Sequence, residues 1–468
     1  MAEEIFVPLT FFGGIKPENK KYSRDYPLRY VTPPELVYIP IDGYVSPLVE
    51  AGGTVAMGQA VAVRDDGMQL YSSVSGIVKG TAKEGEHRYI AIENDKKDTP
   101  FEGIKGIKKP LLELSADEIC ALLKQYSVID CFDEKPMYIK LSEHKGNLKR
   151  IIINCCEHDV YTTALYRLLL ERPKELINGA KILMHALSIK KCVILIEDKK
   201  RKAIQVLEDY VNDTRMFVPA FIENKYPINE QTIISAVYSR EIPHGKTATD
   251  LGYVIFGAEA VMQTFISFAT GMPQIRKAVT VSGESVKKPQ NLIAPIGTPL
   301  KNLIEECGGL VHRCRCVVLG GIMDGEFLEN PGGVVTQTTR QLLLLRWVEK
   351  YNGTRMRCVR CGRCISVCPM HLIPLDYAVE DSLKKKSQKP FYGIEACIEC
   401  GCCEYICPAG IPLLEIIREE KGKRLSGKKS DTETKKPHRK FISVKKTFIR
   451  NRKPKNKDDD ESDFFIPF

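Results

Sequence analysis

Long apolar segments are absent from this chain of 468 residues. It contains no run of about eighteen consecutive apolar residues, so we expect no transmembrane helix. The first residues, MAEEIFVPLTFF, include acids where a secretory signal peptide has basic residues, so we expect no export. The hydrophobic fraction of 43% is nevertheless ordinary for a globular protein. Together with the length, it predicts roughly three or four packed domains.

Cysteine, by contrast, is plentiful and unevenly placed, because nine of the seventeen cysteines lie between positions 358 and 407. Eight of these nine form two copies of the spacing C-x₂-C-x₂-C-x₃-C, each followed by proline. The same run in bacterial ferredoxins holds [4Fe–4S] clusters, and the fourth cysteine of each run binds the cluster of the other run. The sequence therefore predicts two cubane clusters and transfer of single electrons.

The crossed pattern predicts which thiols share a cluster. The first cluster is expected to be held by Cys358, Cys361, Cys364 and Cys407, and the second by Cys397, Cys400, Cys403 and Cys368. A pair of zinc knuckles is the alternative use of eight cysteines. The ninth thiol, Cys402, is expected to pack as a free thiol. Because cluster cysteines must stay reduced during assembly, the pattern also predicts a cytoplasmic protein.

The net charge of +10 comes mainly from the C-terminal tail. Residues 421–457 contain sixteen Lys or Arg and only two acids, and residues 458–468 contain five acids. Such a tail is expected to be disordered. It could bind an anionic membrane surface or serve only as a solvated segment. We do not expect it to bind nucleic acid, because no aromatic stacking platform accompanies the bases.

The N-terminal half predicts two domains of different class. Residues 1–111 contain short alternating strands with glycines at the bends, as in 37–63 and 70–80, and this pattern is typical of a barrel-sandwich hybrid. Residues 112–247 alternate amphipathic helices with buried strands, and Ile151–Asn154 has the composition of a strand in a parallel sheet. We expect an α/β domain there.

The C-terminal half predicts three further regions. Residues 248–339 contain strands and turns typical of a β-grasp unit, and 340–420 are expected to be helical and to carry the clusters. Residues 421–468 form the tail. The whole chain is therefore expected to be a multidomain α+β protein.

Several phrases outside the cysteine runs resemble the RnfC family, the C subunits of the membrane-bound NADH:ferredoxin oxidoreductase called Rnf. The resemblance covers about residues 5–420 in the same order, without the tail. The phrases that carry it, besides both cysteine runs, are Phe12-Gly13-Gly14-Ile15, Tyr226-Pro227, Arg240-Glu241-Ile242-Pro243, Val281-Ser282-Gly283-Glu284 and Pro295-Ile296-Gly297-Thr298-Pro299. It implies a β-grasp unit of the SLBB kind and an α/β domain like the flavoprotein subunit of respiratory complex I.

In this family the α/β domain binds FMN and NADH through a glycine-rich loop, where backbone N–H groups approach phosphate. The matching segment here, 131–138, contains no glycine and includes Asp133 and Glu134. The next family phrase, which contributes to the flavin-type site, keeps Asn154, Glu157 and Tyr161. Because phosphate would meet two acids in the altered loop, we expect NADH not to bind, and FMN is only slightly better supported.

The resemblance implies electron transfer through two [4Fe–4S] clusters as a subunit of a membrane-associated, ion-translocating oxidoreductase complex. Its partners would be other redox subunits and a ferredoxin or a flavoprotein, and it would lie peripherally on the cytoplasmic face of the membrane. Two alternatives stay open. The chain could be a soluble donor to a dedicated reductase, such as an amino-acid reductase, or a structural adaptor whose clusters only support folding.

Overall fold

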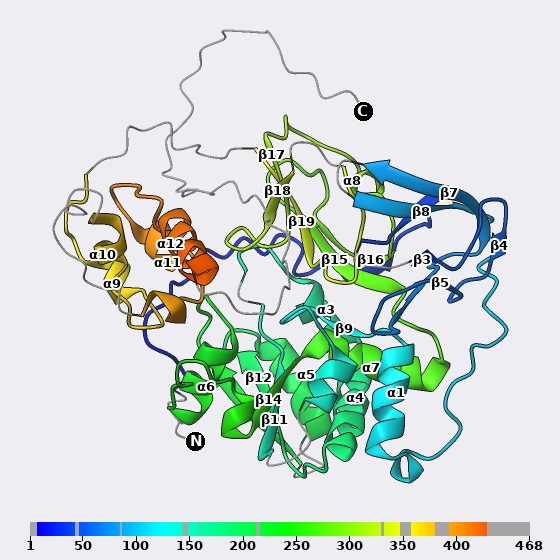
Figure 1. Ribbon diagram of the computed structural model, residues 1–468, viewed down its shortest axis with the longest axis horizontal. Helices are drawn as coiled ribbons and strands as arrows, with labels where there is room; N and C mark the ends of the chain where they lie inside the picture. The colour runs from blue at the N-terminus through cyan, green and yellow to red at the C-terminus, as the bar shows by residue number, and fades with distance from the viewer. Residues whose placement is uncertain are drawn as a thin grey trace, which may run out of the picture.

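The structure is a computed structural model, and it describes residues 7–42, 46–84, 87–143, 148–157, 159–211, 216–328, 332–346, 357–379 and 393–427. Figure 1 shows the small β-domain and the helical cysteine-rich domain at opposite ends of the molecule. The α/β domain and a mixed sheet lie between them. This arrangement confirms the multidomain α+β class that the sequence predicts.

The small β-domain consists of two sheets with the strand orders β2-β8-β7-β4 and β3-β5-β6. Alternate residues of its strands point inward, and Ile39, Val61 and Ile92 are fully buried in the core between the sheets. Its strands are β2 (Leu36–Pro40), β3 (Ser46–Pro47), β4 (Thr54–Val55), β5 (Ala60–Val63), β6 (Gln69–Tyr71), β7 (Gly76–Glu84) and β8 (His87–Asn94).

The α/β domain contains a four-stranded parallel sheet in the order β13-β12-β11-β14. Ile151 and Ile153 belong to the core on one face, and Ile152 belongs to the core on the other, as expected for a sheet covered on both sides. The elements from 111 to 211 are η1 (Leu111–Glu113), α1 (Ala116–Gln125), β9 (Ile129–Asp130), β10 (Lys135–Pro136), α2 (Met137–Ser142), β11 (Arg150–Asn154), α3 (Ala164–Glu171), α4 (Pro173–Ala186), β12 (Cys192–Glu197) and α5 (Arg201–Val211).

This domain extends further along the chain than the predicted boundary at 247. Strand β14 pairs with β11, and helix α7 packs against α4, so residues up to 270 belong to the α/β domain. The boundary lies later because β14 completes the sheet beside β11, a long-range pairing that local pattern does not reveal. The remaining elements are β13 (Phe217–Ile222), α6 (Glu230–Tyr238), η2 (Thr249–Leu251), β14 (Tyr253–Gly257) and α7 (Ala258–Thr270).

The next domain is a six-stranded mixed sheet in the order β1-β16-β15-β19-β17-β18. Two strands of this sheet come from outside the predicted region 248–339. Strand β1 comes from the segment assigned to the barrel-sandwich domain, and β19 comes from the region expected to be helical. The elements are β1 (Leu28–Tyr30), β15 (Arg276–Ser282), β16 (Gln290–Pro295), α8 (Leu300–Glu306), β17 (Cys316–Leu319), β18 (Glu326–Leu328) and β19 (Gln341–Leu345).

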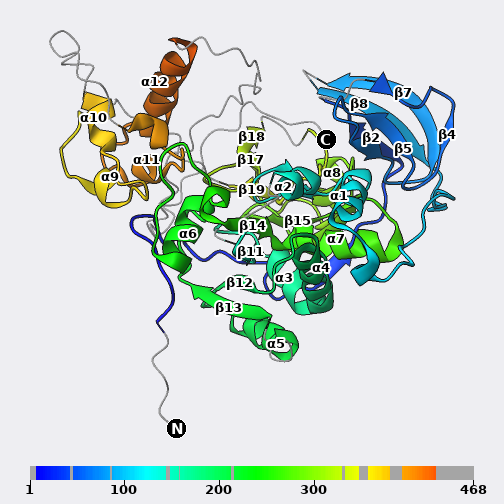
Figure 2. The same cartoon turned by 60° about the horizontal axis from the view of Figure 1, so that its bottom comes forward.

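The cysteine-rich domain is helical, as predicted, and lies apart from the small β-domain in both views (Figures 1 and 2). Its elements are α9 (Arg363–Ser366), α10 (Pro374–Val379), η4 (Ile394–Ala396), α11 (Cys402–Ile406) and α12 (Leu413–Gly427). Helix α12 continues seven residues past the predicted end of the domain at 420. The rest of the predicted tail, 428–468, lies outside the described residues.

None of the helices in the described part of the chain combines the length and the apolar character that crossing a bilayer requires.

The tail can be removed without damage to the cysteine-rich domain only after the end of helix α12. Lys421 donates to the carbonyl oxygen of Cys397 at 2.9 Å and pairs with Glu399 at 2.8 Å, so a chain ending at residue 420 would lose a contact of that domain. We predict that a protein ending at Gly427 binds anionic vesicles more weakly than the full chain at low salt, at about 1 kcal/mol per base removed from the surface. Vesicle co-sedimentation measures this. Equal binding by both proteins would show that the tail is only solvated.

Candidate metal centres

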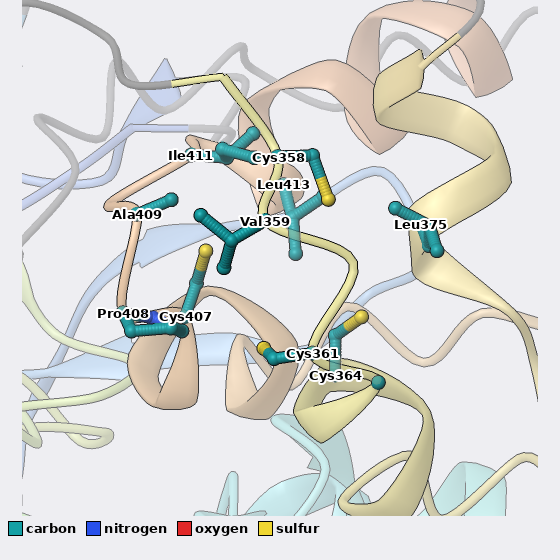
Figure 3. A pocket seen from close by; sticks show the side chains of 11 residues that line it. Cys358, Val359, Cys361, Cys364, Leu375, Cys407, Pro408, Ala409, Ile411 and Leu413 are labelled. Carbon is teal, nitrogen blue, oxygen red and sulfur yellow. The ribbon is translucent and has the colours of Figure 1, made fainter.

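The first predicted set of thiols meets at one pocket. Cys358, Cys361 and Cys364 come from the segment around α9, and Cys407 follows α11. Figure 3 shows the four side chains around one cavity, although Cys407 is more than forty residues away in sequence. The other lining residues are mostly apolar: Val359, Gly362, Leu375, Pro408, Ala409, Ile411 and Leu413.

The second predicted set of thiols meets at another pocket. Cys397, Cys400 and Cys403 come from the second run, and Cys368 comes from the end of the first run. Cys402 also lines this pocket. The remaining lining residues are Pro369, Met370, Leu372, Pro374, Ile398, Gly401, Leu414 and Ile417. The structure thus places all eight cysteines in the crossed groups that the spacing predicts.

The two cysteine loops have the same backbone conformation, thirty-nine residues apart. Arg360 and Glu399 are both left-handed, with φ of 52° and 55°. This turn directs backbone N–H groups toward sulfur, since the N–H of Arg360 donates to Cys358 Sγ at 3.3 Å and that of Glu399 to Cys397 Sγ at 3.4 Å. Such donors stabilise negative charge on a cluster and tune its potential.

Burial affects the protonation of these thiols. It raises the pKa of Cys397 to about 11 and also raises the pKa of Cys368 and Cys364. Because the thiolate is the form that binds metal, loading the pockets must release protons.

The cysteine-rich domain is attached to the rest of the protein through the second pocket. The hydroxyl of Tyr226 donates to the carbonyl of Cys400 at 2.9 Å, and burial raises its pKa well above the usual range, which keeps it a donor. The N–H of Gly14 donates to the carbonyl of Val367 at 2.8 Å. Cys402 is fully buried, and its thiol faces the carbonyl of Tyr226 at 3.8 Å.

Gly13 brings the N-terminal segment into close contact with the first cysteine run. Its φ is +69°, and a Cβ atom there would lie 2.8 Å from the carbonyl carbon and oxygen of Cys368. Beside it, the ring of Phe12 stacks on His371 with centroids 4.2 Å apart. Sequence reasoning noted the Phe12–Ile15 and Tyr226-Pro227 phrases but not their contacts: the first holds the loop that ends in Cys368, and Tyr226 holds Cys400 of the second run.

A separate cavity lies at the carboxyl ends of the parallel strands, where α/β folds bind ligands. Asn154, at the end of β11, and Glu157 both line it. Tyr161 does not, because its hydroxyl donates to Glu284 at 2.7 Å and its ring packs edge-on against Tyr22. The remaining lining residues are Asp130, Cys131, Phe132, Cys156, Asp159, Thr162, Ala164, Leu165, Gly257, Ala258, Glu259, Ala278, Gly321, Asp324, Arg340 and Gln341.

Four stretches of the chain match known domain families, in the order that the fold shows. Residues 9–97 match the RnfC barrel sandwich hybrid domain and residues 133–265 the Nuo51 FMN-binding domain. Residues 278–315 match the SLBB domain and residues 357–411 the 4Fe-4S dicluster domain. The dicluster match agrees with the two cysteine-lined pockets, and the metal groups of this domain are two [4Fe–4S] clusters.

Curated relatives match most of the chain. The C subunit of the proton-translocating ferredoxin:NAD(+) oxidoreductase complex of Clostridium ljungdahlii is 30% identical over 380 residues, which cover 78% of this chain and 83% of that protein. The chain belongs to the RnfC family. The C subunit of the Na(+)-translocating complex of Acetobacterium woodii is 30% identical over 385 residues, covering 79% of this chain and 86% of that protein. The C subunit of the ion-translocating complex of Rhodobacter capsulatus is 28% identical over 396 residues, covering 80% and 75%.

Among solved structures, the NAD+-reducing [NiFe]-hydrogenase in the H2-reduced state aligns with a TM-score of 0.42 at 14% identity. The alignment covers 50% of this chain and 47% of that one.

The residues of this RnfC-family chain fit a phosphate-bearing flavin poorly. Five carboxylates line the cavity, those of Asp130, Glu157, Asp159, Glu259 and Asp324. Among the lining residues in the described part of the chain, the only cation is Arg340, and Asp324 already pairs with it at 2.9 Å. A phosphate would therefore meet more negative than positive charge.

The lysines behind the cavity wall are also engaged. Lys140 pairs with Asp130 at 2.7 Å and with Asp133 at 2.9 Å. Asp133 thus points to Lys140, which it shares with Asp130, whereas the sequence led us to expect an unpaired charge that would oppose a ligand. Lys200 likewise pairs with Glu157 at 3.1 Å and Glu197 at 2.9 Å.

The loop that replaces the glycine-rich segment keeps one glycine-like conformation. Glu134 has a φ of 58°, in the left-handed region that glycine adopts at little cost. The backbone turn therefore remains, while an exposed carboxylate side chain occupies the position.

Crossed ligation predicts the effect of removing the last thiol of the first run. Cys368→Ser should destroy the second cluster, so that reconstituted protein contains about four rather than about eight iron atoms. The matched control is Cys402→Ser, which removes a thiol from the same pocket and should keep both clusters. Iron and acid-labile sulfide analysis with EPR provides the measurement. Loss confined to the first cluster would show that the pairing is wrong.

The contact at Gly13 predicts a second variant. Gly13→Ala places a Cβ against the Cys368 carbonyl, and its left-handed backbone adds about 1–2 kcal/mol. We expect a lower unfolding temperature and a second cluster that is lost more quickly under air. Gly52→Ala is the matched control, because Gly52 has a φ of +83° and no atom within 4 Å of the added Cβ. If both substitutions lowered the unfolding temperature equally, the effect would come from the left-handed backbone alone, and the contact of Gly13 with Cys368 would not contribute.

Proposed function

We propose that this chain carries single electrons through two [4Fe–4S] clusters as the C-type subunit of a membrane-associated, ion-translocating ferredoxin:NAD oxidoreductase complex. The observation that carries the proposal is the pair of pockets, each lined by three cysteines of one run and the fourth of the other. The ligands are Cys358, Cys361, Cys364 and Cys407 for cluster 1, and Cys397, Cys400, Cys403 and Cys368 for cluster 2.

The two clusters differ in their position relative to the protein body. The pocket of cluster 2 contacts the body through Tyr226, whose hydroxyl reaches Cys400. Met323, near Gly321 and Asp324 of the cavity wall, packs in the same apolar group as Cys400 and Cys402. Cluster 2 is therefore the inner centre, next to the cavity, and cluster 1 is the outer one.

We infer that the chain does not itself oxidise NADH and does not retain FMN. The paired lysines and the carboxylate-rich lining support this, since they leave a phosphate without a free cation among the described lining residues. Electrons then enter from a partner protein, a ferredoxin or a flavoprotein. The subunit would lie on the cytoplasmic side of the membrane, where cluster thiols stay reduced.

Redox titration of the full-length, anaerobically reconstituted protein tests the main proposal. Two clusters should each take up one electron at potentials within the ferredoxin range, followed by EPR. A soluble donor to a dedicated reductase would show the same titration. Cell fractionation distinguishes the two functions, because a subunit of a membrane complex should sediment with membranes and a soluble donor should not. Clusters that stay in one oxidation state throughout would instead identify a structural adaptor.

Flavin binding is tested separately. The purified protein should contain no stoichiometric FMN, should not quench FMN fluorescence at micromolar concentration, and should not reduce ferricyanide with NADH. The physical reason is the uncompensated desolvation of phosphate against the carboxylates of the cavity. Stoichiometric FMN together with NADH-dependent ferricyanide reduction would contradict the inference.

A further inference from the structure

The surface beside the pocket of cluster 1 is basic and partly apolar. Arg357, Arg360 and Arg363 are all exposed, and so is the ligand Cys361. Between the arginines lies Val359, whose residue is 62% exposed, followed by Ile365 at 36%. We call this surface the cluster-1 rim, defined as Arg357, Val359, Arg360, Arg363 and Ile365.

The rim has no acidic residues of its own. No Asp or Glu occurs in the sequence from Arg357 to Leu375. In the ranges that the structure describes, no carboxylate forms an ion pair with any of the three guanidinium groups. The positive charge therefore faces solvent, with the two apolar side chains in its midst.

The repeat-related surface beside cluster 2 is different. Glu399 stands in place of Arg360, with the same left-handed backbone, and pairs with Arg418 at 3.0 Å and with Lys421 at 2.8 Å. Ile398, which replaces Val359, is only half-buried, but helix α12 packs over that pocket. The charged residue of one loop is thus paired with the chain's own helix α12, whereas the other loop presents arginines and apolar atoms to solvent.

We propose that the cluster-1 rim is the docking surface of an acidic one-electron carrier protein of the ferredoxin class. This inference rests on the proposed function. Opposite charge selects the carrier and accelerates its encounter, and the small apolar centre within a charged border is typical of a transient interface. Docking there places the partner's redox centre next to the exposed ligand Cys361. One electron passes, so that one centre is oxidised as the other is reduced, and no bond forms or breaks.

The test reverses the rim charge in the full-length protein with both clusters. The variant is Arg357→Glu/Arg360→Glu/Arg363→Glu, and a neutral triple Arg→Gln variant serves if the reversed protein does not fold. The matched control, Lys83→Glu/Arg88→Glu/Lys97→Glu, makes the same charge change on exposed residues of the small β-domain. The probe is an acidic [2Fe–2S] ferredoxin, and its gallium-substituted form, which accepts no electron, reports binding alone.

At low ionic strength we expect the rim variant to bind the gallium protein at least about tenfold more weakly. The second-order rate of electron transfer to the iron form should fall by a similar factor. The control should keep both values, and the difference should shrink at high salt. Iron content and reduction by a small neutral mediator should be the same in all variants.

Equal weakening in rim and control variants, or none in either, would overturn the docking surface. The proposal would also be overturned if the rim variant bound ferredoxin normally but no longer bound anionic vesicles. The three arginines would then form a lipid-binding surface. If small mediators reduced neither cluster in the wild-type protein, the proposed function would fail, and that result is distinct from failure of the rim.

Discussion

The crossed arrangement of the two cysteine runs is the constraint on which the cysteine-rich domain depends. Because Cys368 lies in the pocket of the second run and Cys407 in that of the first, neither pocket is complete until both runs have folded against each other. The part of this domain that the structure describes has a small apolar core, around Tyr377, Ile394 and Leu413. Cluster ligation must therefore supply much of its stability, as in other small metal-bound domains. The same constraint fixes the distance between the two redox centres.

A short N-terminal segment contacts the cysteine-rich domain, which begins more than 340 residues later in the chain. Gly13 can approach the backbone of Cys368 only because it has no side chain, Gly14 bonds to Val367 beside it, and Tyr226 bonds to Cys400 of the second run. The same segment, 7–31, contains β1 near its end, and β1 pairs with β16 in the mixed sheet. One stretch of chain thus joins three domains and fixes the position of cluster 2 relative to the cavity.

The sequence predicted the chemistry of this protein better than its domain boundaries. Cysteine spacing was sufficient to group eight thiols into two pockets, because that spacing is local and its ligation pattern is fixed by cluster geometry. Elements cross the predicted boundaries at 247 and 340 because they pair with remote strands, β14 with β11 and β19 with β15, and helix α12 runs past 420. Single-sequence periodicity carries no information on such pairings.

The cavity shows a related limit of sequence reasoning. The loss of glycines from 131–138 was visible in the sequence, and it indicated altered ligand binding. The ion pairs were not visible, because Asp133 pairs with Lys140, seven residues further on, and Glu157 pairs with Lys200, which is remote in sequence. Nor did the matching phrase show that Tyr161 points to Glu284 and away from the cavity. The poor fit to phosphate therefore results from internal ion pairs, in which Lys140 and Lys200 each already contact two carboxylates.

The two halves of the repeat are similar in backbone and opposite in surface, and under the proposed function this asymmetry would give the electron path a direction in space. Glu399 and helix α12 close the second loop against the chain itself, while Arg360, at the equivalent position, leaves the first loop open. Under the proposed function, the centre beside the protein body would exchange electrons with neighbouring sites of the same complex. An outer centre under an exposed thiol can exchange them with a partner that diffuses. A chain that carried both centres equally buried, or equally exposed, would not separate these two steps.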